Sequence, residues 1–253
     1  MDLIKITHEN LESEHICCAI ANDKDCQVIS KKSWLKERLD EGLVFLKCNV
    51  RGKCFIEYIP AEYAWAPIEA DGYMYIDCLW ISGKFKGQGF SNLLLDECIN
   101  DSKSKGKKGL VILSAKKKMG YLADPKYLKY KGFQSADAVS PYFELMYLPF
   151  SETADKPYFK SHIKMTNRKD KENGFILYYT SQCPFTAKYV PILEDIAKSK
   201  NIDFQAVHLD TTQLAQNAPS PFTTFSLFYN GKLITHEILT DKKFEKLLEE
   251  KVL

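Results

Sequence analysis

The segment CLWISGKFKGQGFSNLLLDECI, residues 78–99, decides the fold of the N-terminal part of the chain. An apolar run enters a loop with glycines at 87 and 89, and the loop enters a segment whose apolar residues recur at helical spacing. Glycine lets a backbone approach a ligand closely, and the amides at a helix N-terminus bind anions. With the charge of Lys86 beside them, these features predict a pyrophosphate site. The loop matches neither G-x-x-x-x-G-K-[ST] nor G-x-G-x-x-G.

Working outward from this loop, residues 1–150 alternate between strand-like and helix-like patterns. We expect strands at 3–7, 43–50, 52–59, 72–82, 110–115, 133–137 and 142–148, and helices at 10–21, 31–40, 91–105 and 124–131. This order predicts an α/β (α+β) domain with a mixed sheet and flanking helices.

Residues 151–171 are polar and without periodicity, so we interpret them as a linker. Residues 172–253 then follow the order β-α-β-α-β-β-α. Asn230-Gly231 is a favoured two-residue hairpin turn, and residues 241–253 form an amphipathic pattern typical of a last helix. The sequence therefore predicts two domains, 1–150 and 172–253.

The composition narrows the function classes. Of 253 residues, 45% are hydrophobic and 27% charged, and the net charge is +2, which gives no general attraction for nucleic acid. No apolar run is long enough for a membrane helix, and no secretory signal is visible, so we expect a cytoplasmic protein with reduced cysteines. The eight cysteines form no C-x2-C pair and the five histidines are dispersed, so we expect no metal site.

The loop resembles the signature [RQ]-x-x-G-x-[GA] of the GCN5-related N-acetyltransferases (GNAT). Lys86, Gly89 and Ser91 stand at its three positions, with lysine in place of Arg or Gln and serine in place of Gly or Ala. The segment YLKYKGF, 127–133, resembles the short helix and Gly-Phe turn of that family. The resemblance implies a GNAT fold over residues 1–150 and acetyl-CoA as cosubstrate. It assigns the pyrophosphate to Lys86, Gly87, Gln88, Gly89, Phe90, Ser91 and Asn92, and the pantetheine arm to the backbone near Leu79 and Ile81.

The same resemblance implies direct attack on the thioester by a primary amine of a small molecule or peptide. Tyr75 and Asp77 share a strand face, and relatives carry their base near these positions. Asp77 is either that base or a structural aspartate bonded to a loop. Glu57 is a second candidate, with an edge position facing solvent as its alternative.

The general acid is less well defined. Where family members often carry a tyrosine, this chain has Leu128. Tyr127 and Tyr130 flank it, and we take Tyr127 as the candidate acid, although both tyrosines also fit ordinary packing. The substitution leaves open a non-catalytic acyl-CoA-binding sensor. Four aromatic residues are candidates to line a pocket for an apolar or aromatic amine, or to pack the core: Tyr58, Tyr63, Trp65 and Tyr73.

Cys183 follows a predicted strand and begins a predicted helix, an arrangement that resembles the active-site turn of thioredoxin-like proteins. The motif is CPFT, with Thr186 where a second cysteine would stand. The resemblance implies that Pro221 is the counterpart of the cis-proline of that fold, with Pro219 as the less favoured alternative. A transferase followed by such a domain resembles bacterial acetyltransferases with a YoaP-type C-terminal region. Two roles remain open, a thiol-redox module acting through Cys183 and a tail that packs on the catalytic domain or shapes a homodimer.

Overall fold

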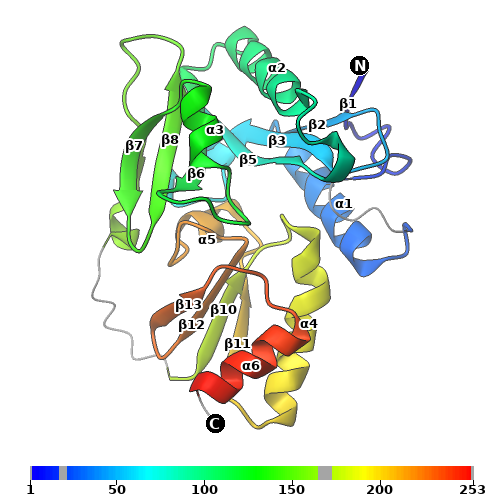
Figure 1. Ribbon diagram of the computed structural model, residues 1–253, viewed down its shortest axis with the longest axis vertical. Helices are drawn as coiled ribbons and strands as arrows, with labels where there is room; N and C mark the ends of the chain where they lie inside the picture. Colours follow the sequence, from blue (N-terminus) through cyan, green and yellow to red (C-terminus); the bar gives the residue numbers. More distant parts are fainter. Residues whose placement is uncertain (1, 17–21, 165–172, 252–253) are drawn as a thin grey trace.

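The computed structural model describes residues 2–16, 22–164 and 173–251. Its two larger sheets occupy opposite ends of the molecule (Figure 1). The first is built from β1 (Leu3–Lys5), β2 (Val44–Cys48), β3 (Cys54–Pro60), β5 (Met74–Ile81), β6 (Gly109–Ala115), β7 (Gln134–Val139) and β8 (Phe143–Pro149). Its helices are α1 (Cys26–Leu39), α2 (Phe90–Ser104) and α3 (Pro125–Tyr130).

The seven strands are ordered β1-β2-β3-β5-β6-β8-β7. All neighbouring pairs are antiparallel except β5 and β6, which are parallel. Leu94 of α2 and Leu128 of α3 belong to a core on one face of the sheet, whereas Trp34 of α1 belongs to the core on the other face. The mixed sheet with flanking helices that we predicted is therefore confirmed.

One irregularity in this sheet creates an opening. β5 pairs with β6 only from Met74 to Ile76, although β5 continues to Ile81 and β6 to Ala115. Beyond Ile76 the two strands diverge, and the edge of β5 that faces β6 has no strand partner among the described residues. We call this opening the fork.

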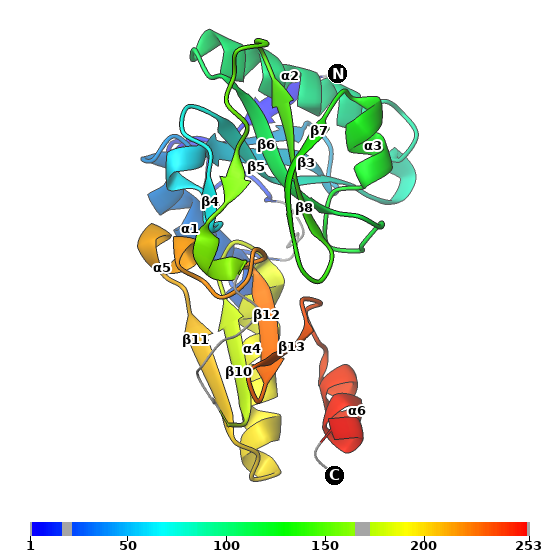
Figure 2. The same ribbon diagram turned by 90° about the vertical axis from the view of Figure 1, so that its left-hand side faces the viewer.

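The C-terminal sheet follows the predicted order. It contains β10 (Phe175–Tyr179), β11 (Phe204–His208), β12 (Phe225–Tyr229) and β13 (Lys232–Thr235), arranged β11-β10-β12-β13. Its helices are α4 (Pro184–Ser199), α5 (Thr212–Gln216) and α6 (Asp241–Lys251). β10 and β11 are parallel, and β12 turns into antiparallel β13 through Asn230 and Gly231, both with positive φ. Figure 2 shows α4 beside β10 and β11, with α6 on the outer side.

A shared hydrophobic core, and not only the connecting segment of the chain, joins the two larger sheets. Leu209 and Ala215 are buried in the same cluster as Trp34 and Trp65. The Trp65 indole donates a hydrogen bond to Thr212 Oγ1 at 3.1 Å. The C-terminal domain thus packs on the face of the first sheet that α1 also covers.

The segment predicted as a linker contributes to this packing. Its residues form β9 (Tyr158–Phe159), which pairs with β4 (Ile68–Glu69), and a short 3-10 helix, η3 (Ser161–Ile163). Phe159 is buried in the shared core. Residues 165–172 lie outside the described part of the chain.

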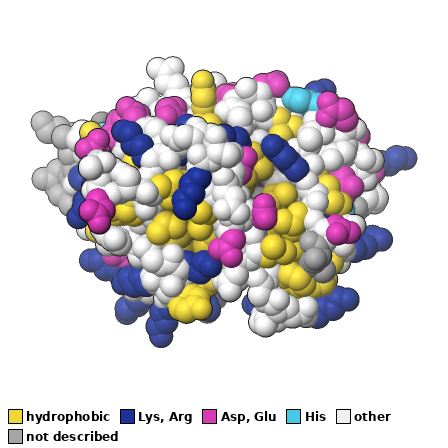
Figure 3. Space-filling view, turned by 90° about the horizontal axis from the view of Figure 1, so that it is seen from above, with side chains coloured by type: hydrophobic (Ala, Val, Ile, Leu, Met, Phe, Trp, Pro, Cys, Tyr) yellow, Lys and Arg dark blue, Asp and Glu magenta, His cyan; other side chains and the backbone are white. Residues whose placement is uncertain are grey.

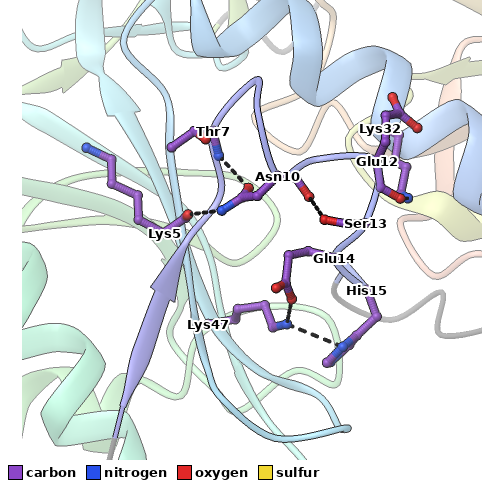
Figure 4. Close-up of polar contacts among 9 residues, drawn as sticks. All are labelled: Lys5, Thr7, Asn10, Glu12, Ser13, Glu14, His15, Lys32 and Lys47. Carbon is purple, nitrogen blue, oxygen red and sulfur yellow. Dashed lines mark hydrogen bonds and ion pairs between the residues drawn. The ribbon is translucent and has the colours of Figure 1, made fainter.

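One predicted helix does not form as expected. Residues 8–13 are a series of turns instead of the first half of a helix at 10–21, and residues 17–21 lie outside the described residues. Asn10 explains the difference, because its side chain accepts from Thr7 N and donates to Lys5 O, and so competes with helical bonding (Figure 4). Lys47 of β2 then holds Glu14 by an ion pair. The other expected helices and strands are confirmed within a few residues, except that α1 starts earlier, at Cys26.

The face of the first domain seen from above carries interspersed basic and acidic side chains, with apolar groups between them (Figure 3). No helix among the described residues has the length and apolar character needed to cross a membrane.

Candidate active site

The predicted pyrophosphate loop has the geometry that an anion requires. Gly87 and Gly89 have φ of 76° and 82°, which favours glycine, and a Cβ at either position would meet nothing within 4 Å. Gly89 precedes the first residue of α2, and no described side chain caps that helix end. Lys86 is exposed beside it. Uncapped amides at the start of a 15-residue helix leave donors and a positive dipole for an anion.

Tyr127 lies at this loop rather than at the strand that carries Asp77. Its hydroxyl donates to Asn92 Oδ1 at 3.2 Å, in the first turn of α2. Burial raises the pKa of Tyr127, while a hydrogen bond with Ser91 opposes the rise. Leu128, its neighbour, is fully buried in the core beneath α2. The structure thus joins Tyr127 with the predicted cofactor residues Ser91 and Asn92.

Asp77 sits at a β-bulge beside the fork. Glu57 pairs with Cys78 and Tyr58 with Ile76, so Asp77 falls between these pairs with no partner on β3. A bulge shifts the alternation of side chains and is often found next to active sites. A small cavity of about 50 Å³ at the fork is lined by Tyr75 and Asp77 together. The two residues that we expected to share a face therefore do meet at one site.

A buried charge cluster surrounds Asp77. Lys31 of α1 forms an ion pair with Glu57 of β3 at 2.7 Å, and both side chains are almost fully buried, at 2% and 1% exposure. Glu57 Oε1 and Asp77 Oδ2 are buried without a hydrogen-bond partner among the described residues. Glu57 is thus not an edge residue facing solvent, and two carboxylate oxygens remain available to a further group.

Burial and neighbouring charge raise the pKa values of the two carboxyl groups in this cluster. Burial raises the pKa of Asp77 well above its usual range, and the nearby charge of Glu57 raises it further. Burial also raises the pKa of Glu57, against the opposing charge of Lys31. A carboxylate with a raised pKa is a stronger base than a surface carboxylate, which suits the removal of a proton from an amine.

Asp77 also opens onto a much larger cavity, of about 630 Å³, between the two domains. The first domain contributes Glu57, Asp77 and Cys78, and the second contributes Gln182, Cys183 and further residues from the start of α4, the segment before β12 and the segment after β13. The Gln182 side-chain amide lies 3.4 Å from Asp77 O and 3.3 Å from Asp77 Oδ1. We call this space the interdomain cavity, and its volume suits a small molecule or a short peptide end.

A chain of hydroxyl groups runs along the interdomain cavity. Tyr121 Oη lies 2.6 Å from Tyr142 Oη, which lies 2.8 Å from His236 Nδ1, and His236 Nε2 lies 2.7 Å from Ser220 Oγ. Tyr121 lines both the fork cavity and the interdomain cavity. Burial raises the pKa of Tyr121, and its hydrogen bond to Tyr142 raises it further, so its hydroxyl stays protonated.

The burial of His236 predicts that the folded protein loses stability at acidic pH. Burial lowers the pKa of His236 from 6.5 to about 3, so the unfolded chain binds a proton that the folded chain refuses. The free energy of unfolding should fall as the pH drops from about 6.5 toward 3. His236→Gln should flatten this part of the profile, measured by urea unfolding at several pH values. An unchanged slope in the variant would contradict the assignment.

Several predicted residues do not reach the site. The Tyr58 and Tyr73 side chains are buried, with their hydroxyls donating to Asp101 Oδ2 and to Asp155 O, and Tyr63 is exposed. Of the four aromatic candidates, Trp65 alone lines either of the two cavities described above. The expected cis-proline at Pro221 is wrong, because the one cis peptide bond among the described residues precedes Pro141. Pro221 nevertheless lines the fork cavity.

Sequence reasoning missed Lys31, Gln182, Tyr121 and His236. Only Lys31 left a signal, because it shares a helical face with Trp34, Leu35 and Arg38 in the segment KKSWLKERL. A lysine on the apolar side of a helix calls for a buried acid partner. The other three depend on contacts between the two domains, which no local pattern predicts.

Comparisons with known proteins found a matching family, a similar protein sequence and similar solved structures. The YoaP-like family matches residues 203–246. A protein of Bacillus subtilis (strain 168) named "Uncharacterized N-acetyltransferase YoaP" is 45% identical over 249 residues, 98% of each chain. YncA of Salmonella typhimurium, solved with acetyl-CoA, covers 61% of this chain and 96% of its own at 16% identity and a TM-score of 0.43. An acetyltransferase of the GNAT family from Desulfovibrio desulfuricans covers 59% and 100% at 12% identity and a TM-score of 0.42.

Proposed function

Because the chain belongs to the family of the YoaP-like N-acetyltransferases, we propose that it transfers an acetyl group from acetyl-CoA directly to a primary amine of a small molecule or peptide. The observation that carries this proposal is the fork. Three features follow one another along a single segment. They are the buried carboxylate of Asp77, the unpaired strand edge at residues 77–81 and the uncapped helix start at Gly89.

The residues fit acetyl-CoA from the pyrophosphate to the thioester. Lys86 and the amides of residues 87–92 hold the pyrophosphate, since glycines with open space above them allow close approach. Tyr127 steadies Asn92 at this end. The backbone near Leu79 and Ile81 lies along the unpaired edge of β5, where the pantetheine arm can add hydrogen bonds. The thioester then lies at the fork, beside Tyr75 and Asp77.

The acceptor amine enters from the interdomain cavity. The buried carboxylates Glu57 and Asp77 attract an ammonium group, and aromatic residues such as Trp80 and Phe222 contact an apolar body. Asp77 removes a proton from the amine as it attacks. Tyr121 takes the role of the general acid for the thiolate that leaves, since its hydroxyl, unlike that of Tyr127, lines the cavity that contains Asp77.

Calorimetric titration with acetyl-CoA, and with coenzyme A in parallel, tests the cofactor site. We expect micromolar binding that Gly89→Glu abolishes, because the new carboxylate repels the pyrophosphate and fills the close approach. Gly106→Glu is the matched control, since Gly106 also has positive φ and open space but lies past the far end of α2. Lys86→Glu, which strains no glycine, should weaken binding at least about tenfold. Absence of binding in the unaltered protein would contradict the proposed function.

A further inference from the structure

The thiol of Cys183 shares the interdomain cavity with the carboxylates of the first domain. Cys183 stands immediately before α4, a helix of 16 residues with Pro184 in its first turn. The start of a helix favours the thiolate form of a cysteine. Cys183 therefore lines the same cavity as Glu57 and Asp77.

A contact between the domains fixes this helix start next to the fork. Gln182, the residue before Cys183, donates from its side-chain amide toward both Asp77 O and Asp77 Oδ1. Thr224 donates to Gln182 Oε1 at 3.3 Å and holds the amide in this orientation. The backbone at Cys183 is therefore fastened, through one side chain, to the strand residue at which β5 leaves β6.

The carboxylates provide a second, independent sign that a reacting group belongs here. Glu57 is 1% exposed, and both its Oε1 and Asp77 Oδ2 lack a hydrogen-bond partner among the described residues. Buried carboxylate oxygens without a donor are costly unless a bound group supplies one. A proton-bearing nucleophile in the interdomain cavity, such as an ammonium or a thiol, would supply it.

The CPFT motif that begins at Cys183 contains no second cysteine. Thr186 occupies the position of a second thiol, and its hydroxyl lies 2.8 Å from Thr180 O and 2.7 Å from Cys183 O. The hydroxyl is thus bonded to the backbone of the turn. The turn provides one nucleophilic sulfur and no resolving thiol within the motif, an arrangement that suits acyl transfer at the sulfur.

We propose that Cys183 is itself an acetyl acceptor, which takes the acetyl group from acetyl-CoA when no amine fills the interdomain cavity. The inference rests on the proposed function for its acetyl donor. The thiol proton passes to Asp77, the sulfur bonds to the acetyl carbon, and the bond from that carbon to the sulfur of coenzyme A breaks. The released thiolate takes this proton from Asp77 and leaves as coenzyme A. One thioester replaces another, so no oxidant or reductant is needed and the acetyl group remains activated toward an amine.

Intact-protein mass spectrometry after incubation with acetyl-CoA, without any amine, tests this step. We expect a mass gain of one acetyl group, located by peptide mapping on Cys183 and removed by neutral hydroxylamine, as a thioester requires. Cys183→Ser should lose this hydroxylamine-sensitive acetyl group. Coenzyme A should compete, and Lys86→Glu should slow the reaction.

A further variant separates a built site from random chemistry. Cys26 is exposed at the start of α1, so Cys26→Ser should leave the acetylation unchanged, and acetyl-CoA should not mark Cys26. Cys78 lines the same cavity as Cys183, and peptide mapping distinguishes an acetyl group on Cys78 from one on Cys183. Acetyl groups on Cys26 or Cys78 in place of Cys183, or no acetylation while calorimetry still detects acetyl-CoA, would overturn the inference. Loss of acetyl-CoA binding itself would instead reject the proposed function.

Discussion

Asp77→Asn should lower kcat by a factor of about 10² to 10⁴, the range that general base catalysis contributes, while the affinity for acetyl-CoA stays unchanged. The substitution keeps the size of the side chain, and its oxygen can still accept from Gln182. It removes the carboxylate that takes the proton from the amine. Steady-state kinetics of thiol release, with an amine acceptor found by screening, would measure kcat, and calorimetry would measure binding.

The pH profile makes this prediction specific to a base. Burial and the charge of Glu57 raise the pKa of Asp77, so in the unaltered protein kcat should rise with pH through a pKa above the ordinary carboxylate range. Below that pKa the carboxylate is protonated and accepts no proton. The rising limb should vanish in Asp77→Asn. Asp71→Asn, an exposed aspartate six residues earlier, is the matched control and should keep both rate and profile. An unaltered rate in Asp77→Asn would leave Asp77 as a structural residue.

The parts of the fold that the sequence predicted are those controlled by local chemistry. The glycines at 87 and 89 have the positive φ that a phosphate loop needs, and Asn230-Gly231 forms the expected hairpin turn. Alternation along β5 placed Tyr75 and Asp77 on one side, although the bulge that makes Asp77 distinct leaves no mark in the sequence. Residues 8–13 failed as a helix because the side chain of Asn10 bonds to the backbone, a competition that apolar periodicity does not reveal.

The candidate site was predictable only on the side that a single domain builds. Gln182 contacts Asp77 across 105 positions of sequence, and the cavity that they share exists only when both domains are packed together. Tyr121 and His236 join the site by the same packing. The C-terminal domain therefore contributes a wall of the interdomain cavity. If this cavity receives the acceptor, as we propose, both domains contribute to acceptor selection.

Lys31→Met should destabilise the protein by about 3–5 kcal/mol, the cost of leaving one member of a buried ion pair without its partner. Lys31 lies 2.7 Å from Glu57, and both are shielded from water. Methionine preserves the aliphatic packing of the side chain but supplies no charge. Urea unfolding, followed by tryptophan fluorescence, would measure the loss, since Trp34 lies directly beside Lys31, whose Nζ is 4.0 Å from the ring centroid.

The direction of the pH dependence identifies the Glu57 carboxylate, left without Lys31, as the cause of the lost stability. Without Lys31, the folded-state pKa of Glu57 rises further above its unfolded value, because only burial remains to act on it. At low pH the carboxyl is neutral in both states and costs little. The difference between Lys31→Met and the unaltered protein should therefore grow as the pH rises through the folded-state pKa that Glu57 has in the unaltered protein, which burial already raises above its ordinary value. Lys32→Met is the control, since its partner Asp23 is exposed and keeps its water. Replacing both partners, Lys31→Met with Glu57→Leu, should restore most of the stability, and a double variant as unstable as the single one would contradict the argument.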